Sequence, residues 1–158
     1  MNVCVCDIGL IGFGKSNEEK ASHLHHKGVN LSKKGKFEEA LECFNEAISI
    51  EPEVWDFWFS KGSALSELQR FEEALECFNE ATVLDSWKTR WEAWFCKGQV
   101  LSHLGRYEET FECFNEAISI DSTNPDFWTW KSFALKKLGR HEEAEQCVAK
   151  AKVIEERE

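Results

Sequence analysis

The chain has 158 residues, of which 42% are hydrophobic and 30% charged, a composition typical of a globular protein with a core of its own. Its 29 acidic residues outnumber the 19 basic ones, and the net charge of −10 argues against a protein that must neutralise nucleic-acid phosphates. No apolar run approaches the roughly 18 residues that a membrane-spanning helix requires. We therefore expect neither a nucleic acid nor a membrane among its partners.

The first 20 residues do not share the pattern of the rest, and we expect a flexible or loosely packed lead-in there. Their apolar part makes a poor signal peptide, because no basic residue precedes it and Asp7 interrupts it, so a cytoplasmic location is expected. Gly9–Ser16 (GLIGFGKS) matches a phosphate-binding loop in which Lys15 would reach a phosphate and Ser16 a magnesium ion. No further strands follow, however, and Ser16 with Glu19 can instead form a capping box at a helix start. We expect no cofactor, and nucleotide binding through Gly9–Ser16 stays an alternative.

Three histidines, His23, His25 and His26, follow this segment and raise the question of a metal site with Cys4 and Cys6. His23 and His26 are three residues apart, a spacing that can place two ligands on one face of a helix. The interval between the cysteines and the histidines matches no established zinc spacing. We therefore expect no metal and interpret the histidines as exposed residues of a terminal helix.

One stretch of the sequence returns at a period of about 34 residues, which is the signature of a repeat architecture. Its copies are FEEALECFNEAISIEP (Phe37–Pro52), FEEALECFNEATVLDS (Phe71–Ser86), YEETFECFNEAISIDS (Tyr107–Ser122) and the degenerate HEEAEQCVAKAKVIEE from His141. The period divides the chain into four units, residues 21–54, 55–88, 91–124 and 125–158, with Thr89 and Arg90 inserted between the second and the third.

Each unit is predicted to contain two helices, because apolar residues recur every three or four positions on both sides of a central break. In the second unit this spacing links Trp58, Gly62 and Leu65 before the break and Phe71 with Phe78 after it. The breaks themselves are glycines or polar residues that suit the end of a helix, namely Gly35, Gln69-Arg70, Gly105 and Gly139. One cysteine recurs per unit as a small packing group, expected to be reduced: Cys43, Cys77, Cys113 and Cys147. The pattern predicts eight antiparallel helices and almost no strand.

These residues resemble the tetratricopeptide repeat family over about residues 21–158. The second unit carries the full pattern, which consists of Trp58, Gly62, Leu65, Phe71, Ala74, Phe78 and Ala81. The other units depart from it at single places, with Leu24 in the first unit, Thr110 in the third, and Ser132, His141 and Val148 in the fourth. The resemblance implies an all-α fold, an α-solenoid in which four antiparallel helix pairs form a right-handed superhelix.

In proteins of this family the first helices of successive units line a concave groove that holds a peptide or a helix. The resemblance and the helical period together nominate the face opposite the core stripe, which holds Ser22, His25, Val29 and Lys33 in the first unit, Asp56, Phe59, Ser63 and Glu67 in the second, Glu92, Phe95, Gln99 and His103 in the third, and Asp126, Thr129, Phe133 and Lys137 in the fourth. Phe59, Phe95 and Phe133 would form an apolar stripe, unless some of them are buried between units. Asp56, Glu92 and Asp126 would line one rim. Such a groove suits a protein or peptide with apolar anchors and basic residues.

The expected function is therefore a non-enzymatic protein-interaction scaffold, since the abundant carboxylates fall at repeated positions of helix surfaces and pair with no nucleophile or base. Trp58, Trp94 and Trp128 belong to the core pattern, whereas four further tryptophans lie outside it and suit contact with a partner: Trp55, Trp87, Trp91 and Trp130. For Trp55 and Trp91, bracing the corners between units is the alternative. Family members that clamp the acidic tails of chaperones use Lys, Asn and Arg in the groove, and those residues are absent at the corresponding places here.

A second alternative is a structural solenoid that assembles end to end. The last unit argues against this, because Glu145 and Lys152 replace the apolar residues of the other units, as expected for a terminal repeat with no neighbour. We expect a monomer or a weak homo-oligomer.

Overall fold

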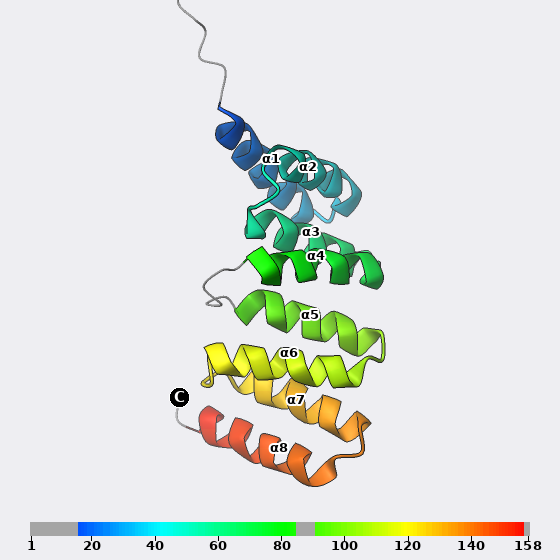
Figure 1. Ribbon diagram of the computed structural model, residues 1–158, viewed down its shortest axis with the longest axis vertical. Helices are drawn as coiled ribbons and strands as arrows, with labels where there is room; N and C mark the ends of the chain where they lie inside the picture. The colour runs from blue at the N-terminus through cyan, green and yellow to red at the C-terminus, as the bar shows by residue number, and fades with distance from the viewer. Residues whose placement is uncertain (1–15, 85–90, 157–158) are drawn as a thin grey trace, which may run out of the picture.

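In the computed structural model, residues 16–84 and 91–156 are described, and these ranges form eight α-helices and no β-strand. Figure 1 shows the helices stacked one after another along the long axis of the molecule. They are α1 (Asn17–Ser32), α2 (Phe37–Ile50), α3 (Trp55–Glu67), α4 (Phe71–Leu84), α5 (Trp91–His103), α6 (Tyr107–Ile120), α7 (Pro125–Lys137) and α8 (His141–Glu155). The fold is an α-solenoid of four antiparallel helix pairs, as the sequence predicts. Trp87, Thr89 and Arg90 lie outside the described residues.

The turn inside each helix pair depends on one residue in the left-handed region of backbone space. Gly35, Gly105 and Gly139 have φ angles of 74°, 72° and 75°. In the second pair Gln69 occupies the equivalent position, with a φ of 58°. After each of them, the next backbone N–H returns to a carbonyl of the last helical turn, for example from Arg106 to the carbonyl of Leu101 at 2.9 Å. This arrangement satisfies carbonyls that would otherwise lack a partner and reverses the chain. The predicted breaks are confirmed.

Helices pack mainly on their neighbours in the chain, both within a pair and from one pair to the next. Within the first three pairs, a glycine of the first helix faces a buried phenylalanine of the second, and the ring occupies the space that a Cβ would need. In the second pair a Cβ on Gly62 would lie 2.9 Å from Cε1 of Phe78. The repeated alanines and cysteines of the second helices fill the rest of this core, with Ala40, Ala74 and Ala144 fully buried.

The repeated cysteines are buried free thiols, as predicted. Burial raises the pKa of Cys77 to about 11 and that of Cys113 to about 12. A thiol with so high a pKa is almost entirely protonated near neutral pH and is a poor nucleophile. These cysteines therefore serve packing, while Cys4 and Cys6 lie outside the described residues.

The helix α1 begins at Asn17, inside the segment that the sequence assigns to the lead-in. Ser16 caps it: the Ser16 hydroxyl accepts from the N–H of Glu19 at 3.1 Å, and the Ser16 N–H donates to the Glu19 carboxylate at 3.2 Å. This reciprocal pair is the capping box that the sequence allows. Gly9–Lys15, the remainder of the phosphate-loop match, lies outside the described residues.

Candidate binding groove on the first helices

The first helices of the pairs form one continuous side of the stack. In addition to the contacts between chain neighbours, α1 contacts α3 and α3 contacts α5, whereas the second helices show no comparable contacts with each other among the described residues. In a curved stack, elements on the inner side approach one another more closely than those on the outer side. The first helices therefore approach one another more closely than the second helices do, and two adjoining hollows open along them.

The first hollow, which we call hollow 1, lies between α1 and α3 and has a volume of about 250 Å³. Its lining is largely apolar and comprises Val29, Ser32, Lys33, Phe37, Phe44, Phe59, Ser60, Ser63, Ala64 and Glu67. Phe44 and Ala64 are buried members of the core, so that the floor of hollow 1 is the core itself.

The second hollow, hollow 2, lies between α3 and α5 and has a volume of about 500 Å³. It is lined by Ser63, Ser66, Glu67, Gln69, Phe71, Phe78, Cys96, Gln99, Val100, His103 and Trp130. Ser63 and Glu67 belong to both hollows, which therefore join along α3. The His103 ring stacks on Phe71, with centroids 4.8 Å apart and planes 2° from parallel, and this contact holds one wall in place.

Trp130 of α7 also lines hollow 2 and belongs to an aromatic cluster with Phe114 of α6 and Phe133 of α7. The Trp130 ring stacks on buried Phe114 at 5.9 Å and meets the Phe133 ring edge-on at 6.0 Å. Trp130 occupies the place that Ser60 and Cys96 hold in the second and third units. Ser60 lines hollow 1, whereas small Cys96 and large Trp130 both line hollow 2.

The structure brings together seven of the residues that the sequence nominates. These line the hollows and are Val29, Lys33, Phe59, Ser63, Glu67, Gln99 and His103. The remaining nominated residues line neither hollow: Ser22, His25, Asp56, Glu92, Phe95, Asp126, Thr129, Phe133 and Lys137. The sequence interpretation considered Ser60 and Cys96 only as groove positions at which the chaperone clamp is absent, and it did not place Trp130 in the groove, although Trp130 stood out as a tryptophan beyond the repeat pattern.

The expected stripe of three exposed phenylalanines is not uniform. Phe59 is half-buried with its ring 5.9 Å from Phe78, and Phe95 is half-buried with its ring 5.5 Å from Phe127. Phe133 alone is exposed, at 39%. Phe95 thus braces successive units, which is a role that the sequence left open, whereas Phe59 packs within its own unit and also reaches hollow 1.

The interpretation of His25 as an exposed residue is wrong. His25 is 8% exposed, and its Nε2 lies 2.8 Å from the Ser60 hydroxyl and 3.9 Å from Oδ2 of Asp56. Burial lowers the pKa of His25, and the carboxylate of Asp56 partly opposes this shift. His25 occupies the position of Phe59 and Phe95 in the following units, where a ring packs between helices.

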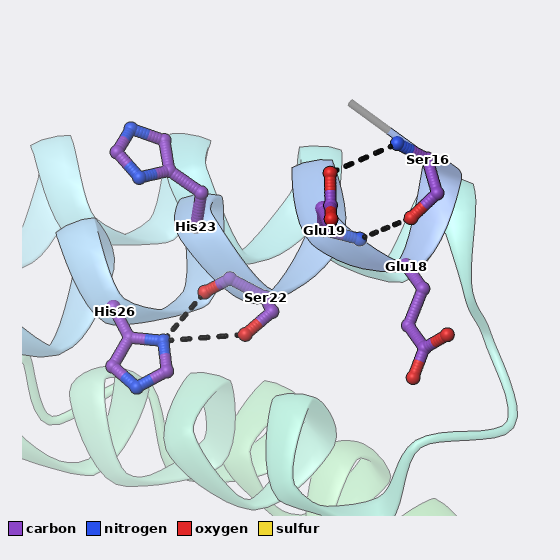
Figure 2. A pocket seen from close by; sticks show the side chains of 6 residues that line it. All are labelled: Ser16, Glu18, Glu19, Ser22, His23 and His26. Atoms are coloured by element: carbon purple, nitrogen blue, oxygen red, sulfur yellow. Dashed lines mark hydrogen bonds between the residues drawn. The ribbon is translucent and has the colours of Figure 1, made fainter. Parts of the chain in front are cut away.

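The other two histidines, His23 and His26, line an open hollow of about 710 Å³ at the start of α1, together with Ser16, Glu18, Glu19 and Ser22. His26 donates from Nδ1 to the Ser22 carbonyl at 2.7 Å, and Figure 2 shows that the rings of His23 and His26 point apart. Within the described part of the chain, no three His, Cys, Asp or Glu side chains gather as metal ligands would. The described helices also include none that is long and apolar enough to cross a membrane.

Comparison with known families settles the nature of the repeats. Models of the tetratricopeptide repeat match residues 27–87, 91–124 and 113–146. The chain belongs to the tetratricopeptide repeat family. The third match runs from the second helix of the third repeat into α8, so that the degenerate fourth unit is recognised in part.

Two comparisons place this tetratricopeptide repeat protein among others. Over 45 residues, 28% of the chain, it is 50% identical to an uncharacterized protein of Methanocaldococcus jannaschii, and the match covers 52% of that protein, about half its length. A crystal structure of MamA superimposes with a TM-score of 0.83 at 20% identity, over 87% of this chain and 79% of that one. A second MamA structure, MSR-1, gives a TM-score of 0.79 at 19% identity, over 91% and 82%. At this level of identity the likeness to MamA establishes the solenoid fold alone.

Proposed function

We propose that the chain is a non-enzymatic scaffold that binds a peptide or a helix of a partner protein across hollows 1 and 2. The observation that carries the proposal is the junction of the two hollows along α3, where Ser63 and Glu67 line both. Together they form an elongated surface that is lined by apolar and aromatic side chains and carries polar groups such as Ser63, Glu67 and Gln99. Such a surface suits a segment that places successive side chains in successive depressions.

The walls of the groove are already held by contacts within the chain, which favours binding with little backbone change. His103 is stacked on Phe71 and Trp130 on Phe114, so that neither ring has to be ordered by a partner. A preformed surface loses less conformational entropy on binding than a flexible one.

The arrangement of Ser60, His25 and Asp56 superficially resembles a nucleophile with its base and carboxylate. In a catalytic triad the serine and the carboxylate bond to opposite nitrogens of the imidazole. Here Ser60 and Asp56 both approach Nε2 of His25, at 2.8 and 3.9 Å, so that Asp56 cannot orient the ring toward Ser60. With His25 also buried, this cluster supports packing between the first two units and no hydrolytic chemistry.

The proposal is tested by selecting ligands from a random twelve-residue peptide display library on the purified full chain. Enriched peptides are synthesised with a fluorescein label, and their dissociation constants are measured by fluorescence anisotropy. Ser63→Phe introduces the side chain that the fourth unit carries at the same position, as Phe133, and fills the junction of the hollows. We expect it to weaken binding at least about tenfold, because one excluded anchor side chain is worth more than about 1.4 kcal/mol.

Ser119→Phe is the matched control, because Ser119 is an exposed serine of a second helix whose hydroxyl, like that of Ser63, donates to a backbone carbonyl of its own helix. This variant should bind the peptides as the wild type does, and circular dichroism should show both variants folded. The proposal fails if no peptide is enriched, or if a folded Ser63→Phe variant binds with unchanged affinity.

A further inference from the structure

The two hollows differ in chemistry, and we propose that the partner segment places an aliphatic side chain in hollow 1 and an arginine in hollow 2. This inference rests on the proposed function, since it names the class of segment that the same groove accepts. It is argued from the side chains that line each hollow and from their charges.

Hollow 1 fits an uncharged apolar side chain. Its floor and walls are formed by Val29, Phe37, Phe44, Phe59 and Ala64, and its volume of about 250 Å³ exceeds that of one aliphatic side chain. Lys33 and Glu67 both line hollow 1, and their opposite charges give it no net preference for a charged side chain. Burial of an aliphatic side chain in such a hollow contributes about 1.5–3 kcal/mol.

Hollow 2 combines one carboxylate with an aromatic wall. Glu67 is its one acidic lining residue, no lysine or arginine lines it, and Glu67 forms no ion pair among the described residues. Trp130 lines the same hollow, and its indole is braced by Phe114. A cation that enters hollow 2 therefore meets an unpaired carboxylate and an aromatic ring, which together favour it.

Arginine fits this pair of groups better than lysine does. A guanidinium is planar, stacks on an aromatic face and donates two parallel hydrogen bonds to a carboxylate, whereas an ammonium is a compact and strongly hydrated charge. Hollow 2, at about 500 Å³, is the larger of the two and accommodates a long side chain. The small side chains of Ser63 and Cys96 leave the approach open.

Overall charge supports the same choice. The chain carries a net charge of −10, so that a basic segment is attracted over long range and an acidic one is repelled. The hollows open between successive first helices, and packed helices are about 8–10 Å apart. In an extended segment that advances about 3.3 Å per residue, the aliphatic residue and the arginine would therefore stand about two to four residues apart.

The test uses the peptides selected on the full chain and a double-mutant cycle between arginine and Glu67. The first prediction is that enriched peptides carry an arginine two to four residues from Leu, Ile or Val. Each peptide is then compared with an analogue that has citrulline, an uncharged isostere, in place of arginine. We expect Glu67→Gln to weaken binding of the arginine peptide about three- to tenfold and to leave the affinity for the citrulline peptide unchanged. A factor of this size is typical of a partly exposed ion pair with added hydrogen bonds.

Glu76→Gln serves as the control, because Glu76 is an exposed glutamate of α4 that lines neither hollow. It should leave both peptides unaffected. The inference is overturned if peptides that Ser63→Phe blocks contain no arginine, or if Glu67→Gln weakens the arginine and citrulline peptides equally. In both cases the groove still binds peptides and the proposed function stands. If the enriched peptides bind the Ser63→Phe variant as they bind the wild type, or if no peptide is enriched, the groove is not a binding site. The proposed function and this inference then both fail.

Discussion

At the scale of single residues, His25 shows how one substitution in a repeat changes the chemistry of a shared position. Its ring lies 4.9 Å from the Phe57 ring and 5.7 Å from that of Phe44, as a phenylalanine would. Unlike a phenylalanine, it also bonds to Ser60 and can take up a proton. The first repeat is therefore joined to the second through a titratable group.

The lowered pKa of His25 predicts a stability that depends on pH. Because burial holds its pKa below the ordinary 6.5, the unfolded chain binds a proton at this histidine more readily than the folded chain does. The contribution of His25 is therefore fully present above pH 6.5 and is lost as the pH falls below it. Asp56 reduces the effect and His26 adds to it, and the slope cannot exceed about 1.4 kcal/mol per pH unit.

Urea unfolding at about pH 7.5 and about pH 5.5 measures this dependence. His25→Phe, which copies the residue of the next two units, should lose less stability on acidification than the wild type. His23→Phe alters an exposed histidine of the same helix and should behave as the wild type does. Equal losses in all three proteins would show that protonation of His25 does not destabilise the fold.

At the scale of helix pairs, the approach of the two helices is set by one small residue and one large one. Gly28, Gly62 and Gly98 face Phe44, Phe78 and Phe114. The equivalent positions of the last pair hold Ser132 and Val148, where a larger residue of the first helix accompanies a smaller residue of the second. Ser132 is 2% exposed, and its hydroxyl has no hydrogen-bond partner.

These pairs predict opposite effects for two substitutions to alanine. Gly62→Ala should destabilise the fold by about 1–3 kcal/mol, because the new Cβ would lie 2.9 Å from the enclosed Phe78 ring. The gain in helix propensity, up to about 1 kcal/mol, offsets only part of this. Ser132→Ala should stabilise the fold by about 1 kcal/mol, since it removes a buried hydroxyl that lacks a partner.

Both free energies of unfolding can be measured by chemical denaturation of the full chain. A Gly62→Ala variant as stable as the wild type would mean that α3 and α4 can separate to admit a methyl group. A destabilised Ser132→Ala variant would mean that the Ser132 hydroxyl does find a partner in solution.

Some features of the helix pairs can be predicted from the sequence and others cannot. Helix number and turns follow from the repeat, because the spacing of apolar residues is local and recurs in each unit even where single residues such as Leu24 and Val148 depart from the pattern. The hollows do not follow from it, because they arise where residues of different units differ in size. Large Trp130 and small Cys96, one unit earlier, both line hollow 2. Helical periodicity gives the direction of Phe95 but not the Phe127 ring that covers it.

At the scale of the whole molecule, each unit is stabilised chiefly by its neighbours, and the last unit covers the apolar surface of the third. Half-buried Phe111 of α6 packs against the cluster of Leu135, Ala144 and Cys147 from the last pair. In α8 the residues equivalent to Phe111 and Ile118 of α6 are Glu145 and Lys152, and both are exposed. At these two positions α8 presents charged side chains where α6 presents apolar ones, which does not favour stacking of copies through α8.

A chain shortened after Asn124 should keep three folded units, since contacts in a solenoid are local. It should also self-associate, because removal of α7 and α8 uncovers Phe111 and neighbouring apolar side chains of α6. Phe111→Glu with Ile118→Lys transfers the polar pair of α8 to the new terminal helix and should return the shortened chain to a monomer. Sedimentation velocity over a range of concentrations, with circular dichroism to confirm helix content, measures both expectations.

If the shortened chain stays monomeric without these substitutions, the polar residues of α8 are not what keeps this end of the solenoid from associating. If it unfolds, the fourth unit supplies more than a cover, and the third cannot stand as a terminal repeat.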